Sequence, residues 1–259
     1  MEAALFLMLL LIGLSVGFLS GLLGIGGGIV MFPLLMYVPP LLGLQTIGIK
    51  HITGLTMVQG FFAALTALLY YHKNALVNKS LVLTLGVSIF LSSLIGALAS
   101  KMFPDAALLM VFGVLALIAA VMMLIPRSYG RDELTEEHVE YSKSAAIAIG
   151  IVLGFSIGLV GQGGAFILIP TLLYLLKIPL RVALGSTLAI GLFSSSAGFA
   201  GKIATGQVPF LMAVPLIVGA VPAARWGSMV GKRTNVQVLR WLLAAIICAT
   251  AVKVWMDII

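Results

Sequence analysis

The feature that most constrains this chain is a series of long apolar segments separated by isolated charged residues. We expect these segments over 3–21, 25–39, 46–70, 80–99, 104–125, 144–160, 164–177, 182–203, 208–225 and 236–257. A helix needs about 20 apolar residues to cross the core of a bilayer. Of all residues, 61% are hydrophobic and 9% are charged, whereas soluble domains carry about 25% charged residues. The sequence therefore predicts an all-α, polytopic membrane protein with the lipid bilayer as its surroundings.

The charged residues lie mostly between these segments. The formal net charge is +7, but no long basic run and no nucleic-acid-binding motif occurs, so we expect no nucleic-acid partner. Lys and Arg in short loops are instead typical of the residues that orient a membrane protein. The one cysteine, Cys248, lies in an apolar run and is expected to pack. We predict no cofactor and no metal.

The chain divides into two halves that begin alike. We interpret residues 1–126 as a first membrane repeat, 127–143 as a polar cytoplasmic linker and 144–259 as a second membrane repeat. Residues 12–37 align with 149–174 without gaps, with 12 identities in 26 positions. The identical pairs are Ile12/Ile149, Gly13/Gly150, Gly17/Gly154, Phe18/Phe155, Gly21/Gly158, Leu22/Leu159, Gly24/Gly161, Gly26/Gly163, Gly27/Gly164, Pro33/Pro170, Leu35/Leu172 and Tyr37/Tyr174. Since half of these are glycines, we infer an internal repeat.

The distribution of basic residues decides between two topologies. If residues 1–40 cross the membrane once, the 15 Lys and Arg divide seven to eight between the two sides. If 1–40 and 144–177 each leave and return to one side, the division is eleven to four. The second topology follows the positive-inside rule, with the basic face cytoplasmic and both termini external. It predicts two inverted repeats of about five helical segments each, starting with Gly-rich broken or re-entrant helices. The sequence does not decide whether the pair of Gly-containing segments at the start of each repeat is re-entrant or a full hairpin.

Glycines form two kinds of pattern at the start of each half. A stripe at Gly13, Gly17, Gly21 and Gly24, repeated at 150, 154, 158 and 161, lies on one helix face and is expected to let helices pack closely. Two clusters are different, because consecutive glycines weaken a helix and leave backbone amides available. The clusters are Gly24, Ile25, Gly26, Gly27, Gly28 and Gly161, Gln162, Gly163, Gly164, Ala165.

Each cluster opens a short segment that we expect to end at Pro33 or Pro170. Its amides should therefore lie at a helix N-terminus, where unpaired N–H groups and the helix dipole favour an anion. All eight acidic residues lie in loops or at segment ends, whereas cation carriers commonly place carboxylates inside spans. The sequence therefore favours a small anionic substrate.

Polar residues in two later segments are further candidates. Neutral groups that we expect to contact substrate are Thr53, Thr56, Gln59, Ser186, Thr187 and Ser194. Candidates for proton coupling are His51, because imidazole titrates near neutral pH, and the basic residues Lys50 and Lys202. For each hydroxyl a helix-to-helix hydrogen bond is the competing interpretation, and for each lysine an interfacial position.

The duplicated motifs resemble the sulfite exporter TauE/SafE family. They run from Gly21 to Pro33 and from Gly158 to Pro170, and the tetrapeptide at 185–188 is similar to the polar motif that follows in the family. The segment 48–53 departs from that motif. The resemblance implies a prokaryotic inner-membrane permease that exports sulfite or small organosulfonates such as sulfoacetate, driven by the proton gradient.

Two other functions are weighed against this one. A passive small-anion channel would use the same amides and hydroxyls. An intramembrane enzyme is not predicted, because the sequence contains no HExxH motif, paired intramembrane Asp or GxSxG nucleophile motif. The sequence does not decide the oligomeric state, and a homodimer is one of the states that it allows.

Overall fold

The computed structural model describes residues 3–23, 27–71, 77–125, 141–161 and 166–258, which form ten α-helices. No strand occurs in these ranges. The helices are α1 Ala3–Leu23, α2 Gly28–Leu41, α3 Ile49–Tyr71, α4 Lys79–Ala99, α5 Asp105–Leu124, α6 Lys143–Val160, α7 Leu168–Tyr174, α8 Leu180–Ala204, α9 Phe210–Arg233 and α10 Val236–Ile258. Eight helices in this part of the chain are long and apolar enough to cross a bilayer, while α2 and α7 are shorter. The predicted polytopic all-α fold is confirmed.

Three element ends differ from the sequence prediction. The helix expected to stop at 225 continues to Arg233, because hydropathy marks only the apolar part of a helix that extends further. The segment expected over 164–177 contains only seven α-helical residues, and the chain turns at Lys177, which has a φ of 55°. Helix α2 does not end at Pro33, nor α7 at Pro170, since both prolines lie inside their helices. Neighbouring helices commonly make such prolines tolerable in membrane proteins.

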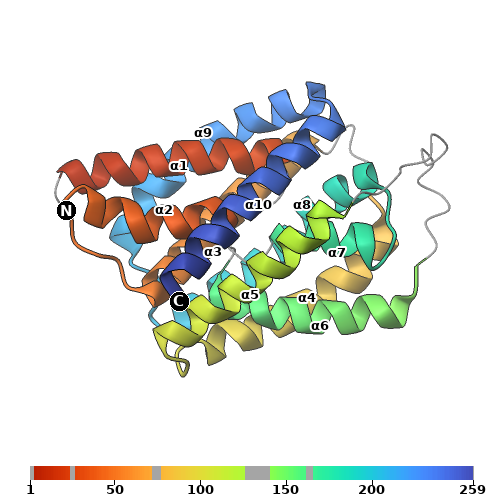
Figure 1. Ribbon diagram of the computed structural model, residues 1–259, viewed down its shortest axis with the longest axis horizontal. Coiled ribbons are helices and arrows are strands. Elements are labelled where there is room, and N and C mark those ends of the chain that lie inside the picture. Colours follow the sequence, from red (N-terminus) through yellow and green to blue (C-terminus); the bar gives the residue numbers. More distant parts are fainter. Residues whose placement is uncertain (1–2, 24–26, 72–76, 126–140, 162–165, 259) are drawn as a thin grey trace.

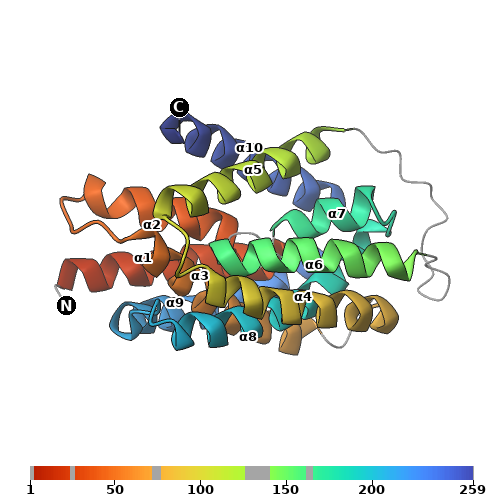
Figure 2. The same cartoon turned by 90° about the horizontal axis from the view of Figure 1, so that it is seen from below.

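The helices place the chain ends and the middle of the chain at opposite ends of the molecule. Helices α1 and α2 run in opposite directions, so α2 returns toward the end where α1 begins (Figure 1). Helix α10 also ends there, whereas α5 ends and α6 begins at the far end. Figure 2 shows α5 and α10 crossing over one side of the molecule, next to α2 and α7.

The glycine stripes bring two pairs of helices into backbone contact, as predicted. A Cβ at Gly13 or Gly17 would collide with the backbone of α9, at Leu216 or Ala220. In the second half, the stripe of α6 packs in the same way on α4, for example where Gly154 meets Ile89. Small residues permit this approach because no side chain separates the two backbones.

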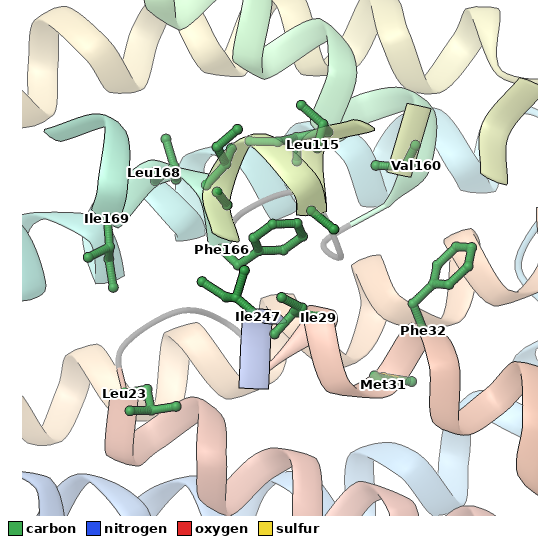
Figure 3. Close-up of a cluster of buried hydrophobic side chains, with 14 of the residues drawn as sticks. Leu23, Ile29, Met31, Phe32, Leu115, Val160, Phe166, Leu168, Ile169 and Ile247 are labelled. Atoms are coloured by element: carbon green, nitrogen blue, oxygen red, sulfur yellow. The ribbon is translucent and has the colours of Figure 1, made fainter. Parts of the chain in front are cut away.

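An apolar cluster joins the first turns of the two short helices. Phe32 of α2 stacks on Phe112 of α5 with ring centroids 4.3 Å apart, and Phe112 meets Phe166 edge-on at 5.9 Å. Figure 3 shows Ile29 and Ile247 beside Phe166. All five side chains are buried. The beginnings of α2 and α7, which belong to different halves of the chain, therefore meet inside the protein.

Candidate functional site

A lysine is fully enclosed among α3, α4, α6 and α8. Lys202, in the last turn of α8, has an exposed fraction of 0%. Its Nζ donates toward four oxygens: Thr53 Oγ1 at 2.8 Å, Ser100 Oγ at 2.7 Å, Gln207 Oε1 at 2.9 Å and the carbonyl of Leu159 at 3.1 Å. An ammonium has three N–H groups, so every one of them has an acceptor.

Each oxygen is positioned by the end of a secondary-structure element. Thr53 lies in the first turns of α3, and Ser100 is the C-cap of α4. Leu159 is the next-to-last residue of α6, whose final carbonyls have no partner within the helix. Gln207 follows α8, and its Nε2 also donates to Ser100 Oγ at 3.0 Å. The cluster therefore links the first half of the chain to the second.

The acceptors around Lys202 are all neutral. No carboxylate among the described side chains lies within hydrogen-bonding distance of Nζ, and Asp105 is exposed at the start of α5. The carbonyl ends of α6 and α8 carry partial negative charge, which favours a cation there. Neutral dipoles lower the energy of a buried ammonium but do not cancel its charge. A positive charge on Lys202 therefore has no negatively charged side chain within hydrogen-bonding distance among the described residues.

The second glycine cluster begins directly beside Lys202. Gly161 ends α6 with φ 85° and ψ −173°, a conformation that glycine alone adopts readily. A Cβ at this position would collide with Thr56 Oγ1 and would lie 2.5 Å from the Thr53 carbonyl. The structure thus brings together four predicted residues, namely Gly161, Thr53, Thr56 and Lys202.

Two other predicted residues are buried without hydrogen-bond partners. Gln59 and Ser194 each have an exposed fraction of 0%, and neither the Gln59 amide nor the Ser194 hydroxyl has a partner in the described structure. Gln59 lies one turn after Thr56 on α3. Buried polar groups are usually paired, so unpaired ones require an explanation such as a ligand or water.

The remaining predicted hydroxyls have structural partners elsewhere. Ser186 Oγ accepts from the N–H of Asn78 at 3.3 Å, and Thr187 Oγ1 donates to the Leu184 carbonyl at 3.0 Å. Both lie in the first turns of α8, far along the helix from Lys202. The structure does not bring these two residues to the lysine cluster.

The candidate coupling residues differ in burial. Lys50 is partly buried, and its Nζ donates to the Lys101 carbonyl at 3.0 Å. His51 is exposed. Only Lys202 is inside the protein. Lys50 nevertheless touches the cluster through its backbone, because its carbonyl accepts from Thr53 Oγ1 at 2.8 Å.

The first glycine cluster is described from Gly27 onward. Gly27 is the N-cap of α2 with φ 69° and makes no side-chain cap, and its carbonyl accepts from the N–H groups of Val30 and Met31 at 3.1 Å. Gly27, Gly28 and Ile29 are buried, so this helix start is inside the protein. The other members of the two clusters lie outside the described residues: Gly24, Ile25, Gly26, Gln162, Gly163, Gly164 and Ala165.

Residues 9–254 match the family described as "Sulfite exporter TauE/SafE". The chain belongs to the sulfite exporter TauE/SafE family. It is 28% identical to the "Probable membrane transporter protein YunE" of Bacillus subtilis, over 94% of this chain and 96% of that protein. It is 30% identical to a "Probable membrane transporter protein" of Xylella fastidiosa strain 9a5c, over 92% of this chain and 90% of that protein. No solved structure gives a significant match. Membership confirms the resemblance seen in the sequence and makes the chain a membrane transporter by family.

Sequence reasoning missed three polar residues of this TauE/SafE protein. Ser100 and Gln207 contact Lys202, and Ser20 is buried with an unpaired hydroxyl. Ser100 and Gln207 follow the ends of α4 and α8, so they look like loop residues until the fold places them inside. Ser20 lies within the glycine stripe of α1, where the spacing of glycines hides a lone serine. No pattern in the sequence marks these residues; only the burial of Lys202 in the fold shows that nearby loop residues must supply its acceptors.

Proposed function

We propose that this protein is a secondary transporter of small sulfur-containing anions, such as sulfite or sulfoacetate, and that it exports them. The observation that carries the proposal is the buried ammonium of Lys202, which has only neutral acceptors among the described residues. An interior with uncompensated positive charge attracts an anion and repels a cation. The sulfur-containing substrate and the export direction come from the family resemblance.

The arrangement of contacts supports inverted repeats. The glycine stripes are equivalent at an offset of 137, and their partners on α4 and α9 are equivalent at an offset of 131, as in Ile89/Ala220. The relation extends to Gly96, whose Cβ would meet the Phe155 carbonyl, and Gly227, whose Cβ would meet the Phe18 carbonyl. Such reciprocal packing is expected when two similar halves are related by a pseudo-two-fold axis.

The bond between Lys202 and Thr53 suggests how an anion acts on the two halves. Lys202 of the second half donates to Thr53 and Ser100 of the first half. An ammonium attracts an anion more strongly than it attracts a neutral hydroxyl, because opposite charges add a Coulombic attraction to the hydrogen bond. An arriving anion therefore competes for Nζ and weakens the link between the halves. Alternating access requires a contact of this kind that substrate can release.

Gln59 and Ser194 are proposed to complete the substrate shell. Both belong to long helices that pack together, and both present unsatisfied donors. During transport, these two side chains exchange hydrogen bonds to water for hydrogen bonds to the anion. Gly161 keeps the end of α6 close enough to α3 for Leu159 to reach Lys202.

The membrane placement is part of the same proposal. We place the protein in a prokaryotic inner membrane, with the ends of α1 and α10 outside and the 127–143 linker in the cytoplasm. The helix directions in Figure 1 are consistent with this placement. Proton coupling is assigned to Lys202, with Lys50 and His51 at the outer entrance.

A ligand panel and a flux assay test the function. Purified protein in detergent is heated with sulfite, sulfate, sulfoacetate, sulfolactate, taurine or thiosulfate, and a substrate is expected to raise the unfolding temperature. In proteoliposomes, flux of that anion should saturate and should respond to an imposed pH gradient. Flux that is linear in concentration and indifferent to the gradient would instead indicate a passive anion channel. If no anion stabilises the protein or crosses the membrane, the proposal is wrong.

A further inference from the structure

Ser20 differs from most serines in the described helices of this protein, and shares an unpaired buried hydroxyl with Ser194. Ser15, Ser156, Ser195 and Ser228 each donate to the carbonyl four residues earlier, at 2.7 to 2.9 Å. This local bond is the usual way for a serine in an apolar helix to satisfy its hydroxyl. Ser20 has an exposed fraction of 0%, and its Oγ has no partner in the described structure. Its hydroxyl therefore lacks the local bond to its own helix and remains available.

The side chain of Ser20 adjoins the start of α2. The position that a Cβ on Gly27 would occupy lies 3.2 Å from Ser20 Cβ and 2.7 Å from the Val16 carbonyl. Gly27 is the N-cap of the 14-residue helix α2 and supplies no side chain to cap it. The N–H groups of Gly28 and Ile29 follow, and the first amides of a helix have no acceptor within it. An unpaired hydroxyl and a buried helix N-terminus thus lie next to each other.

The corresponding place in the second half lacks the hydroxyl. At the offset of 137 that relates the two halves, Ser20 corresponds to Ile157, which is buried and apolar. Helix α7 has only seven residues, which makes it half as long as α2. The described residues of the two halves therefore differ in polarity at this point.

From these observations we infer that the first half carries an oxyanion-binding subsite, formed by Ser20 Oγ and the N–H groups of Gly28 and Ile29. This inference rests on the proposed anion transport and specifies where the anion's oxygens bind. Three donors converging from a hydroxyl and two amides suit a group with several acceptor oxygens, such as a sulfite or sulfonate head. A positively charged or purely apolar solute would leave these donors unpaired.

The test compares two serine variants of the same helix. Ser20→Ala removes the unpaired hydroxyl, and Ser15→Ala removes an exposed hydroxyl that is satisfied by the Leu11 carbonyl. Affinity for sodium sulfite is measured by isothermal titration of detergent-purified protein, with sodium chloride at equal ionic strength as the blank. The unfolding temperature is recorded with and without sulfite.

We expect Ser20→Ala to weaken sulfite binding by about ten- to hundredfold, since a hydrogen bond to a charged group is lost. Its unfolding temperature without sulfite should equal or exceed that of the wild type, because no protein partner loses a bond. Ser15→Ala should bind within about twofold of the wild type. If Ser20→Ala binds sulfite as the wild type does, or unfolds earlier without sulfite while binding normally, the subsite is refuted although the proposed function stands. Absence of sulfite binding by the wild type would instead refute the proposed substrate.

Discussion

Lys202 Nζ lies 2.8 Å from Thr53 Oγ1, so the last turn of α8 is hydrogen-bonded to the first turns of α3. Replacing Thr53 with Val keeps the shape of the side chain and removes this acceptor. We expect the variant to lose about 1–2 kcal/mol of unfolding free energy, because the bond is made by a buried charged group. Unfolding in a mixed-micelle titration measures the loss.

Thr66→Val is the matched control on the same helix. Thr66 Oγ1 donates to the Phe62 carbonyl within α3, at 2.8 Å. Removing this local bond should change the unfolding free energy by no more than about 0.5 kcal/mol. Equal losses in the two variants would show that the link between α3 and α8 adds nothing to stability.

Gly161→Ala should be more damaging than Gly206→Ala. Both glycines have positive φ, at 85° and 71°, so both variants introduce backbone strain. A Cβ at 206 has no neighbour within 4 Å, whereas a Cβ at 161 collides with Thr56 Oγ1. We expect the collision to add about 1–3 kcal/mol to the strain that the two variants share. Thermal unfolding in detergent compares them, and indistinguishable unfolding temperatures would argue against the close contact between α6 and α3.

Gly96→Ala and Gly227→Ala should destabilise the protein by similar amounts. Each new Cβ meets a backbone carbonyl of the facing helix, that of Phe155 or Phe18. The cost should be about 1–3 kcal/mol for each, because two backbones must move apart. Gly48→Ala is the control, since its Cβ would have only His51 Nδ1 at 4.0 Å. A large effect in one half and none in the other would contradict equivalent packing.

The sequence could predict that the long apolar segments form helices, because a segment in lipid must satisfy its own backbone hydrogen bonds. It could predict the close packing at the glycine stripes, because small residues at helical spacing let helices approach in lipid. It could not predict that Pro33 lies inside α2, because proline normally ends a helix in water while neighbouring helices support it here. Nor could it rank the candidate polar residues. Lys202 is buried and Lys50 only partly so because of where α4 and α6 end, and no local pattern in the sequence records those positions.

Cysteine labelling tests the proposed orientation in the membrane. In a Cys248→Ala background, Asp105→Cys places a thiol at the exposed start of α5, and Lys143→Cys places one at the start of α6. A membrane-impermeant maleimide added to intact spheroplasts should label the first variant, whereas the second should react only after the membrane is permeabilised. The reverse pattern would place the termini inside the cell, and labelling of both from outside would contradict the predicted topology.

The central claim is that Lys202 provides the charge that selects an anion, and counterflow tests it most directly. Proteoliposomes loaded with unlabelled sulfite are diluted into radiolabelled sulfite, and the initial rate of label uptake is measured for the wild type, Lys202→Met and Lys79→Met, which changes an exposed lysine at the start of α4. The account predicts transient accumulation by the wild type, a rate at least about tenfold lower for Lys202→Met, and a rate within about twofold for Lys79→Met. Wild-type uptake no faster than in protein-free liposomes, or equal uptake by a folded Lys202→Met protein, would contradict it.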